Sequence, residues 1–70
     1  MKIDEIYAAV EGNIGKSCEV TLKDGSRMRN VIYHGTMGDT SFSPPQFYLI
    51  VSEGKGENKI SFYDIESINF

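Results

Sequence analysis

Seventy residues are enough for one small domain, and a chain of this length buries only about 60% of the surface that it exposes when unfolded. One cysteine excludes an internal disulfide, and one cysteine with one histidine leaves no zinc cluster. A hydrophobic content of 40% excludes a disordered chain, and a net charge of -3 argues against broad electrostatic capture of nucleic acid. We therefore expect a folded domain that is stabilised by oligomerisation.

Neither a membrane segment nor a catalytic site is predicted. No run approaches the roughly 20 apolar residues of a membrane helix, and the first residues lack the pattern of a secretory signal, so we expect a cytoplasmic protein without membrane association. No serine or cysteine lies in a nucleophile motif, and His34 has no partner that spacing identifies. We expect neither an enzyme nor a cofactor or metal.

A short helix is predicted over residues 2–11. Ile3, Ile6, Tyr7 and Val10 lie on one face of a 3.6-residue period, and acidic residues in the first turn suit the helix dipole. At about ten residues such a helix is marginal alone, so its apolar face should dock on the rest of the domain.

Two strands are predicted next, over residues 17–23 and 27–34. Apolar and polar residues alternate in the first strand, and Asp24 and Gly25 after it tolerate the positive φ of a tight turn. The second strand should place its apolar residues inward at Met28 and Ile32, with Asn30 inward between them. A polar residue at that position indicates a bend in the strand.

Residues 35–45 are predicted to form a long loop, because this stretch holds two glycines and two adjacent prolines. Phe42 within it is either a plug for the core or an exposed contact for another protein. Residues 46–52 form the most continuous apolar run and are predicted to be the central strand, buried on both faces or nearly so.

The last two strands are predicted over residues 59–63 and 66–70. Their isoleucines and phenylalanines make them either the closing strands of a small barrel or edges that pair with another copy. The whole chain, residues 1–70, is thus predicted to be one mainly β domain. Its expected architecture is a short N-terminal helix followed by a five-stranded, strongly bent antiparallel SH3-like barrel.

Several side chains could contact a ligand. Lys23, Arg27 and Arg29 form a short basic ridge that could bind phosphate, although cross-strand ion pairs with Glu19 are the better interpretation. The residues that could stack on bases or contact a ligand include Tyr33, His34, Phe42, Phe62 and Tyr63. In small barrels aromatic residues more often belong to the core or to a subunit interface.

The order of these elements, with two short motifs, resembles the Sm-like family of small ring-forming proteins. The first motif is carried by residues 14–16, 20–25, 29–32 and 47–51, and the second by residues 60–68 with isoleucines at 60, 65 and 68. The resemblance covers about fifty residues. It implies an Sm-like barrel in which the fourth strand of one subunit pairs with the fifth strand of the next, closing a ring of five to seven copies.

The resemblance also implies functional residues. The subunit interface would be formed by Ile60, Phe62, Ile65, Ile68 and Phe70. Single-stranded RNA would bind around the pore, where Asp39 and Gln46 occupy the region of the family's RNA-binding loop and Ser61-Phe62 stands in place of an Arg-Gly pair. The leading hypothesis is an RNA-binding homo-oligomeric ring, and the alternative is a protein-interaction or scaffold module whose partner contacts the 35–45 loop.

Overall fold

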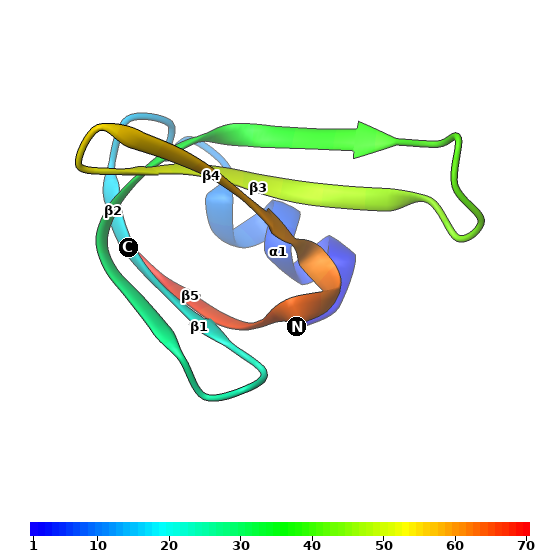
Figure 1. Cartoon of the computed structure of the whole chain (residues 1–70), viewed down its shortest axis with the longest axis horizontal. Helices are drawn as coiled ribbons and strands as arrows, with labels where there is room; N and C mark the ends of the chain where they lie inside the picture. The colour runs from blue at the N-terminus through cyan, green and yellow to red at the C-terminus, as the bar shows by residue number, and fades with distance from the viewer.

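The computed structural model describes residues 1–70 and consists of one short helix and a five-stranded antiparallel sheet (Figure 1). The elements in chain order are α1 (Ile3–Val10), β1 (Ser17–Leu22), β2 (Arg27–Asp39), β3 (Gln46–Glu53), β4 (Gly56–Ser61), a 3₁₀ turn (Phe62–Asp64) and β5 (Ile65–Asn69). The strand order is β4-β3-β2-β1-β5, so β2 and not β3 lies in the middle. No helix is long and apolar enough to cross a membrane.

The sheet bends because β2 carries two irregularities. Cys18 pairs with Val31 and Val20 with Met28, so two β2 residues lie opposite Glu19, and one of them, Asn30, has a φ of 55°. This bulge confirms the predicted bend at Asn30. A second bulge separates the pairs Tyr33–Val51 and Gly35–Ile50, where Gly35 has a φ of 135° that side chains rarely adopt.

The first bulge also corrects the predicted inward residues. Asn30 is exposed, and the extra residue shifts the alternation so that Val31 and Tyr33 are buried. Met28 and Ile32 are only half-buried. An extra residue in a strand exchanges the faces to which the following side chains point. Strict alternation along β2 therefore predicted the wrong inward residues after Met28.

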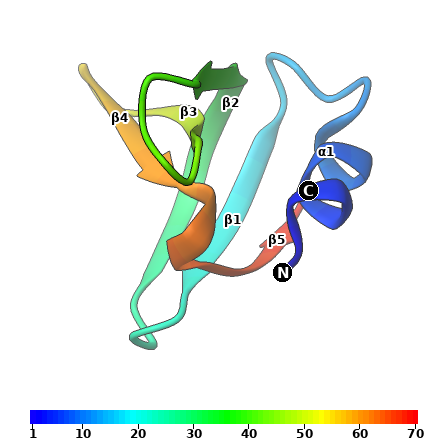
Figure 2. The same ribbon diagram turned by 90° about the vertical axis from the view of Figure 1, so that its right-hand side faces the viewer.

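The core lies between α1 and the concave side of the bent sheet, as Figure 2 shows. Its members come from every element and are Ile6, Val10, Cys18, Val20, Val31, Tyr33, Leu49, Val51, Ile60, Phe62, Ile65 and Ile68. The predicted helix and its docking are confirmed. Tyr7 is half-exposed, but its ring still packs edge-on against Phe62 with ring centres 5.3 Å apart.

The predicted 35–45 loop is wrong in its first half. β2 continues to Asp39 and pairs with β3 as far as Gln46, so the connecting loop is limited to residues 40–45. The two glycines that favoured a loop are accommodated in the strand, and the ring of Phe47 lies where a side chain at Gly38 would point. The outer part of this hairpin, residues 37–48, extends past the last β3–β4 pair, Tyr48–Ser61, and is called the arm here (Figure 1).

The other boundaries also shift. β3 buries only Leu49 and Val51, and therefore one face, where burial on both faces was predicted. β4 covers Gly56–Ser61 instead of 59–63, because Phe62 turns inward in the 3₁₀ turn. β5 begins one residue early, at Ile65.

The sheet does not close into a barrel within one chain. β4 pairs only with β3, and β5 pairs only with β1, so each has one free edge. The fold is thus mainly β with an N-terminal helix and an open, strongly bent five-stranded antiparallel sheet.

Candidate functional site

Three of the residues predicted to contact RNA lie together at the end of the arm. Asp39 and Gln46 form the last pair of the β2–β3 ladder. The Tyr63 hydroxyl donates a hydrogen bond of 2.8 Å to the carbonyl oxygen of Pro45 and so joins the 3₁₀ turn to the same loop. Residues 39–46 with Tyr63 are called the tip cluster here.

Local hydrogen bonds order the tip cluster. The Asp39 carboxylate accepts hydrogen bonds from the backbone N–H and the hydroxyl of Ser41, and the Gln46 amide donates one of 3.3 Å to the Pro44 carbonyl. The hydrogen bonds from Ser41, and to a lesser degree the charge of Lys59, lower the pKa of Asp39. The cluster therefore offers an ionised carboxylate at neutral pH beside an amide and a half-exposed aromatic ring.

Two further residues extend this surface. Tyr48 pairs with Met37 and Ser61 on the convex side of the sheet, and the Lys59 ammonium lies 5.0 Å from the centre of its ring. The sequence analysis missed Tyr48 because residues 46–52 were predicted to be buried on both faces, and it gave no role to Lys59. Alternation was the available signal, since Leu49 and Val51 point inward and Tyr48 and Ile50 point to the other side.

The structure does not bring His34, Tyr33 or Phe62 into this cluster. His34 lies near the opposite end of β3, where its Nε2 is 2.7 Å from the Ser52 hydroxyl. Tyr33 and Phe62 are core residues, 4% and 1% exposed. Burial raises the pKa of the Tyr33 hydroxyl. Their burial agrees with the core role that is more frequent for aromatic residues in small barrels, and it leaves a base no access to either ring.

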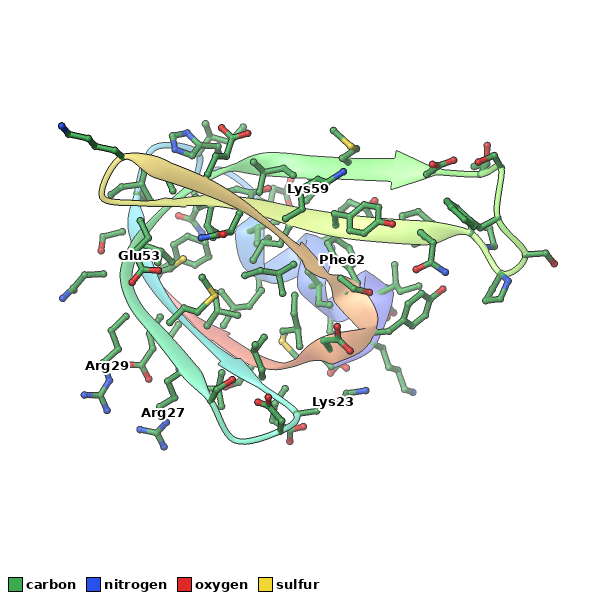
Figure 3. All side chains as sticks on the ribbon, in the orientation of Figure 1. Lys23, Arg27, Arg29, Glu53, Lys59 and Phe62 are labelled. Carbon is green, nitrogen blue, oxygen red and sulfur yellow. The ribbon has the colours of Figure 1, made fainter.

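The basic ridge lies away from the tip cluster. Arg27 and Arg29 project at the lower left of the view, on the far side from the arm, whereas Lys23 lies below the 3₁₀ turn (Figure 3). The Lys23 backbone N–H donates a hydrogen bond of 2.9 Å to the Asp64 carbonyl. Arg29 Nε is 3.3 Å from a Glu19 carboxylate oxygen, as the ion-pair interpretation predicted. This pair is largely exposed and contributes at most about 1 kcal/mol to stability.

Four of the five side chains predicted for the subunit interface are buried within the chain itself. Ile60, Phe62, Ile65 and Ile68 are at most 8% exposed, so they support the domain's own core. Alternation alone cannot distinguish a core from an interface, and the contact of β4 and β5 with a second copy stays a prediction. Phe70 remains 45% exposed, and the β4 and β5 backbones keep their free edges.

A shallow apolar hollow lies beside the C-terminal end of α1. Its volume is about 400 Å³, and its lining residues are Tyr7, Ala8, Val10, Glu11, Gly12, Ile14 and Tyr33. Phe70 borders it, because its ring packs against Tyr33 with ring centres 5.8 Å apart. We call this feature the helix hollow. Its only charged lining residue is Glu11.

No three His, Cys, Asp or Glu side chains come close enough together to hold a metal ion. Cys18 is buried, and burial raises the pKa of its thiol, which makes it a core residue and not a nucleophile. No protein-family model, curated protein or solved structure matches the chain.

Proposed function

We propose that the chain is a self-assembling module of the Sm-like kind, in which β4 of one copy pairs with β5 of the next. A ring of five to seven copies would then close. The observation that carries this proposal is the open strand order β4-β3-β2-β1-β5, which leaves one free edge on the first strand and one on the last.

Physical reasons favour such pairing. A free edge presents a row of unpaired backbone N–H and C=O groups, and head-to-tail pairing that closes on itself removes the free edges of both outer strands. The two edges differ in sequence, since β4 carries Glu57 and Lys59 whereas Glu66 is the charged residue of β5. The small core, with 12 buried residues of 70, also gains from added pairing.

Paired proline substitutions on β4 test this assembly. Neighbouring residues of an antiparallel edge strand direct their N–H groups alternately toward the partner strand and toward the open side. Of Asn58→Pro and Lys59→Pro, one therefore breaks the β3–β4 ladder, and the other removes only an outward N–H. The variant that keeps the circular dichroism of the wild type should elute as a monomer in size-exclusion chromatography with light scattering. An unchanged oligomer in that folded variant would contradict edge pairing.

A second candidate function is binding of single-stranded RNA by the assembled copies. The tip cluster favours it, because Tyr63 offers a ring for stacking while Asp39 and Gln46 offer groups that recognise base edges. Closure into a ring would repeat this cluster once per copy. The net charge of -3 per chain opposes the electrostatic part of binding.

Fluorescence anisotropy with a labelled uridine-rich RNA tests the second candidate. Binding should weaken steeply with salt, and Tyr63→Ala should weaken it by the roughly 1–3 kcal/mol typical of a stacked base. Arg27→Ala is the matched control, since Arg27 lies on the basic ridge away from the cluster. If the assembly binds none of a panel of RNAs, RNA binding is excluded and the scaffold function remains as the candidate.

A further inference from the structure

A third stretch of free strand edge runs along β2 into the arm. β1 pairs with β2 only as far as Ile32, and backbone hydrogen bonds then join Tyr33 to Gly15 and Lys16. Beyond this point residues 35–39 of β2 pair with β3 alone, and Figure 1 shows them along the upper border of the arm. We call the outer side of residues 35–39 the β2 edge. Pairing of β4 with β5 would leave it uncovered.

The β3–β4 ladder determines where each β3 residue directs its backbone groups. Only residues 54–55 connect these strands, so Glu53 and Gly56 at the turn form a hydrogen-bonded pair. Hydrogen-bonded pairs recur at every second position of an antiparallel ladder, and one of them is Leu49 with Ile60. Leu49 therefore directs its N–H and C=O groups toward β4, and the β3 residues on either side of it direct theirs toward β2.

The same alternation continues into β2. The β3 residues that flank Leu49 pair with Gly35 and Met37, which therefore direct their N–H and C=O groups toward β3. Thr36 and Gly38 direct theirs to the open side, and both residues are exposed. The β2 edge thus offers the backbone groups of Thr36 and Gly38 to a further strand. Residues 35–38 hold no lysine, proline or charge, which commonly protect such an edge.

A second copy supplies a strand that matches this edge. When two β2 edges pair antiparallel about a twofold axis at Met37, Thr36 of each copy lies opposite Gly38 of the other, so the outward N–H and C=O groups meet. The Met37 side chains, each 48% exposed in the single chain, then form a non-hydrogen-bonded pair, in which side chains lie closest. Asp39 lies opposite Gly35, which keeps the two carboxylates apart.

Charge complementarity favours a second copy as the occupant. In this register Asp39 of one copy comes to the end of the edge where Lys16 of the other lies beside β2. The lowered pKa of Asp39 keeps its carboxylate ionised at neutral pH, and Lys16 takes part in no ion pair of its own chain. Lys59 also attracts Asp39, but it lies two strands away on β4. The twofold axis places opposite charges at both ends of the contact.

We propose that two copies of the chain join through their β2 edges as an antiparallel pair centred on Met37. This contact uses neither β4 nor β5, so it goes beyond the proposed ring and stands whether or not the ring forms. The paired stretch is short, so the contact is weak and forms only at protein concentrations above those at which a closed ring assembles.

Register-specific cross-linking tests the contact. In Met37→Cys the two new thiols face each other across the axis, with Cα atoms about 4.5 Å apart and within disulfide range. Thr40→Cys is the matched control, because this residue is equally exposed but the register separates its two copies by roughly 20 Å. With oxidised glutathione, Met37→Cys should form the disulfide dimer roughly tenfold faster or more. Cys18 is buried and takes no part.

A backbone variant tests the hydrogen bonding of the same edge. Thr36→Pro removes an outward N–H and leaves the β2–β3 ladder intact, as proline does at a free edge. Added to Met37→Cys, it should reduce cross-linking to the rate of Thr40→Cys without changing the circular dichroism. These measurements are made in the folded, non-pairing β4 proline background, which separates this contact from the ring. The proposal is overturned if the Thr40→Cys control cross-links as fast as Met37→Cys, or if the folded Thr36→Pro chain keeps the fast cross-link.

Charge reversal tests the register without a change in the backbone. Asp39→Lys and Lys16→Asp should each weaken self-association in sedimentation velocity, because each homodimer then brings like charges together. A 1:1 mixture of the two variants should form heterodimers, since every contact between them joins opposite charges. A mixture that associates no better than the separate variants would contradict the proposed register.

Discussion

The packed half of the molecule and the arm belong to the same sheet but differ in how far their side chains are buried. In the packed half, α1, β1, β5 and the 3₁₀ turn bury Ile6, Val20, Phe62 and Ile65 almost completely. In the outer arm, β2 and β3 still pair regularly as far as Asp39 and Gln46, yet Met37 is half-exposed and Gly38 has no side chain.

The two regions therefore have different roles: the packed half stabilises the fold, and the arm presents side chains for interaction. Free energy of folding comes mainly from apolar surface removed from water, so it is concentrated where α1 covers the sheet. The arm is held by backbone pairing, by the packing of Phe47 against Tyr7 and Phe62, and by one hydrogen bond from Tyr63. Beyond Phe47 it leaves apolar side chains available to other molecules. Substitutions in the two regions should therefore act on different measurements.

The largest effect is expected for Phe62→Ala in the packed half. Phe62 is 1% exposed and packs against Tyr7 and Phe47. Its truncation should lower the free energy of unfolding by roughly 3–5 kcal/mol, most of the stability of so small a domain. Urea denaturation followed by circular dichroism measures the loss. Met37→Ala on the arm is the control, and a comparable loss there would contradict the separation of the two regions.

A smaller effect is expected at the bulge that connects the regions. Asn30 has a φ of 55°, a conformation that asparagine and glycine tolerate and that a β-branched residue does not. Asn30→Val should cost about 1–2 kcal/mol of unfolding free energy, whereas Asn30→Gly should stay within about 0.5 kcal/mol of the wild type. Equal stability of the two variants in urea would show that the bulge is not required.

At the contact between the 3₁₀ turn and the arm loop, Tyr63→Phe should change local order more than global stability. It removes the hydrogen bond to the Pro45 carbonyl, a partly solvated bond for which we expect about 0.5 kcal/mol. Amide hydrogen exchange of residues 40–43 should accelerate while that of β1 stays constant. Tyr48→Phe removes a hydroxyl from the same sheet without touching the loop, and equal acceleration in that variant would argue against the Tyr63 contact.

The smallest effect concerns the pH dependence of the arm loop. Hydrogen bonds from Ser41 hold the pKa of Asp39 below its ordinary value of 3.8, so the ionised form stabilises the folded loop. That contribution is present above pH 3.8 and is lost as the pH falls through the lowered pKa. The NMR shift of the Ser41 amide should follow this titration. In Asp39→Asn the titration should vanish, and its persistence would assign it to another group.

Local patterns in the sequence predicted the elements that depend on local chemistry. The period of Ile6 and Val10 placed the helix, Asp24-Gly25 placed the first hairpin turn, and Asn30 marked the bend. The arm could not be predicted in this way, because Gly35 and Gly38 look like loop residues until Ile50 and Phe47 are seen to pair with them. Tertiary pairing overrides local propensity at such positions.

The candidate site was predicted only in part for the same reason. Asp39, Gln46 and Tyr63 meet because a ladder pair and one hydrogen bond bring the arm loop to the 3₁₀ turn. Tyr33 and Phe62 have the same chemistry, but packing places them in the core. Which aromatic residues are accessible is decided by the two bulges in β2 and by the 3₁₀ turn, and residue type alone does not reveal it.

Native mass spectrometry of the purified chain at several concentrations tests the central claim, that the free edges of β4 and β5 join copies into a closed assembly. The account predicts one dominant species of five to seven copies whose number does not grow with concentration, because a closed ring has no free β4 or β5 edge left. A monomer at all concentrations would contradict the claim, and so would an open series whose size increases with concentration.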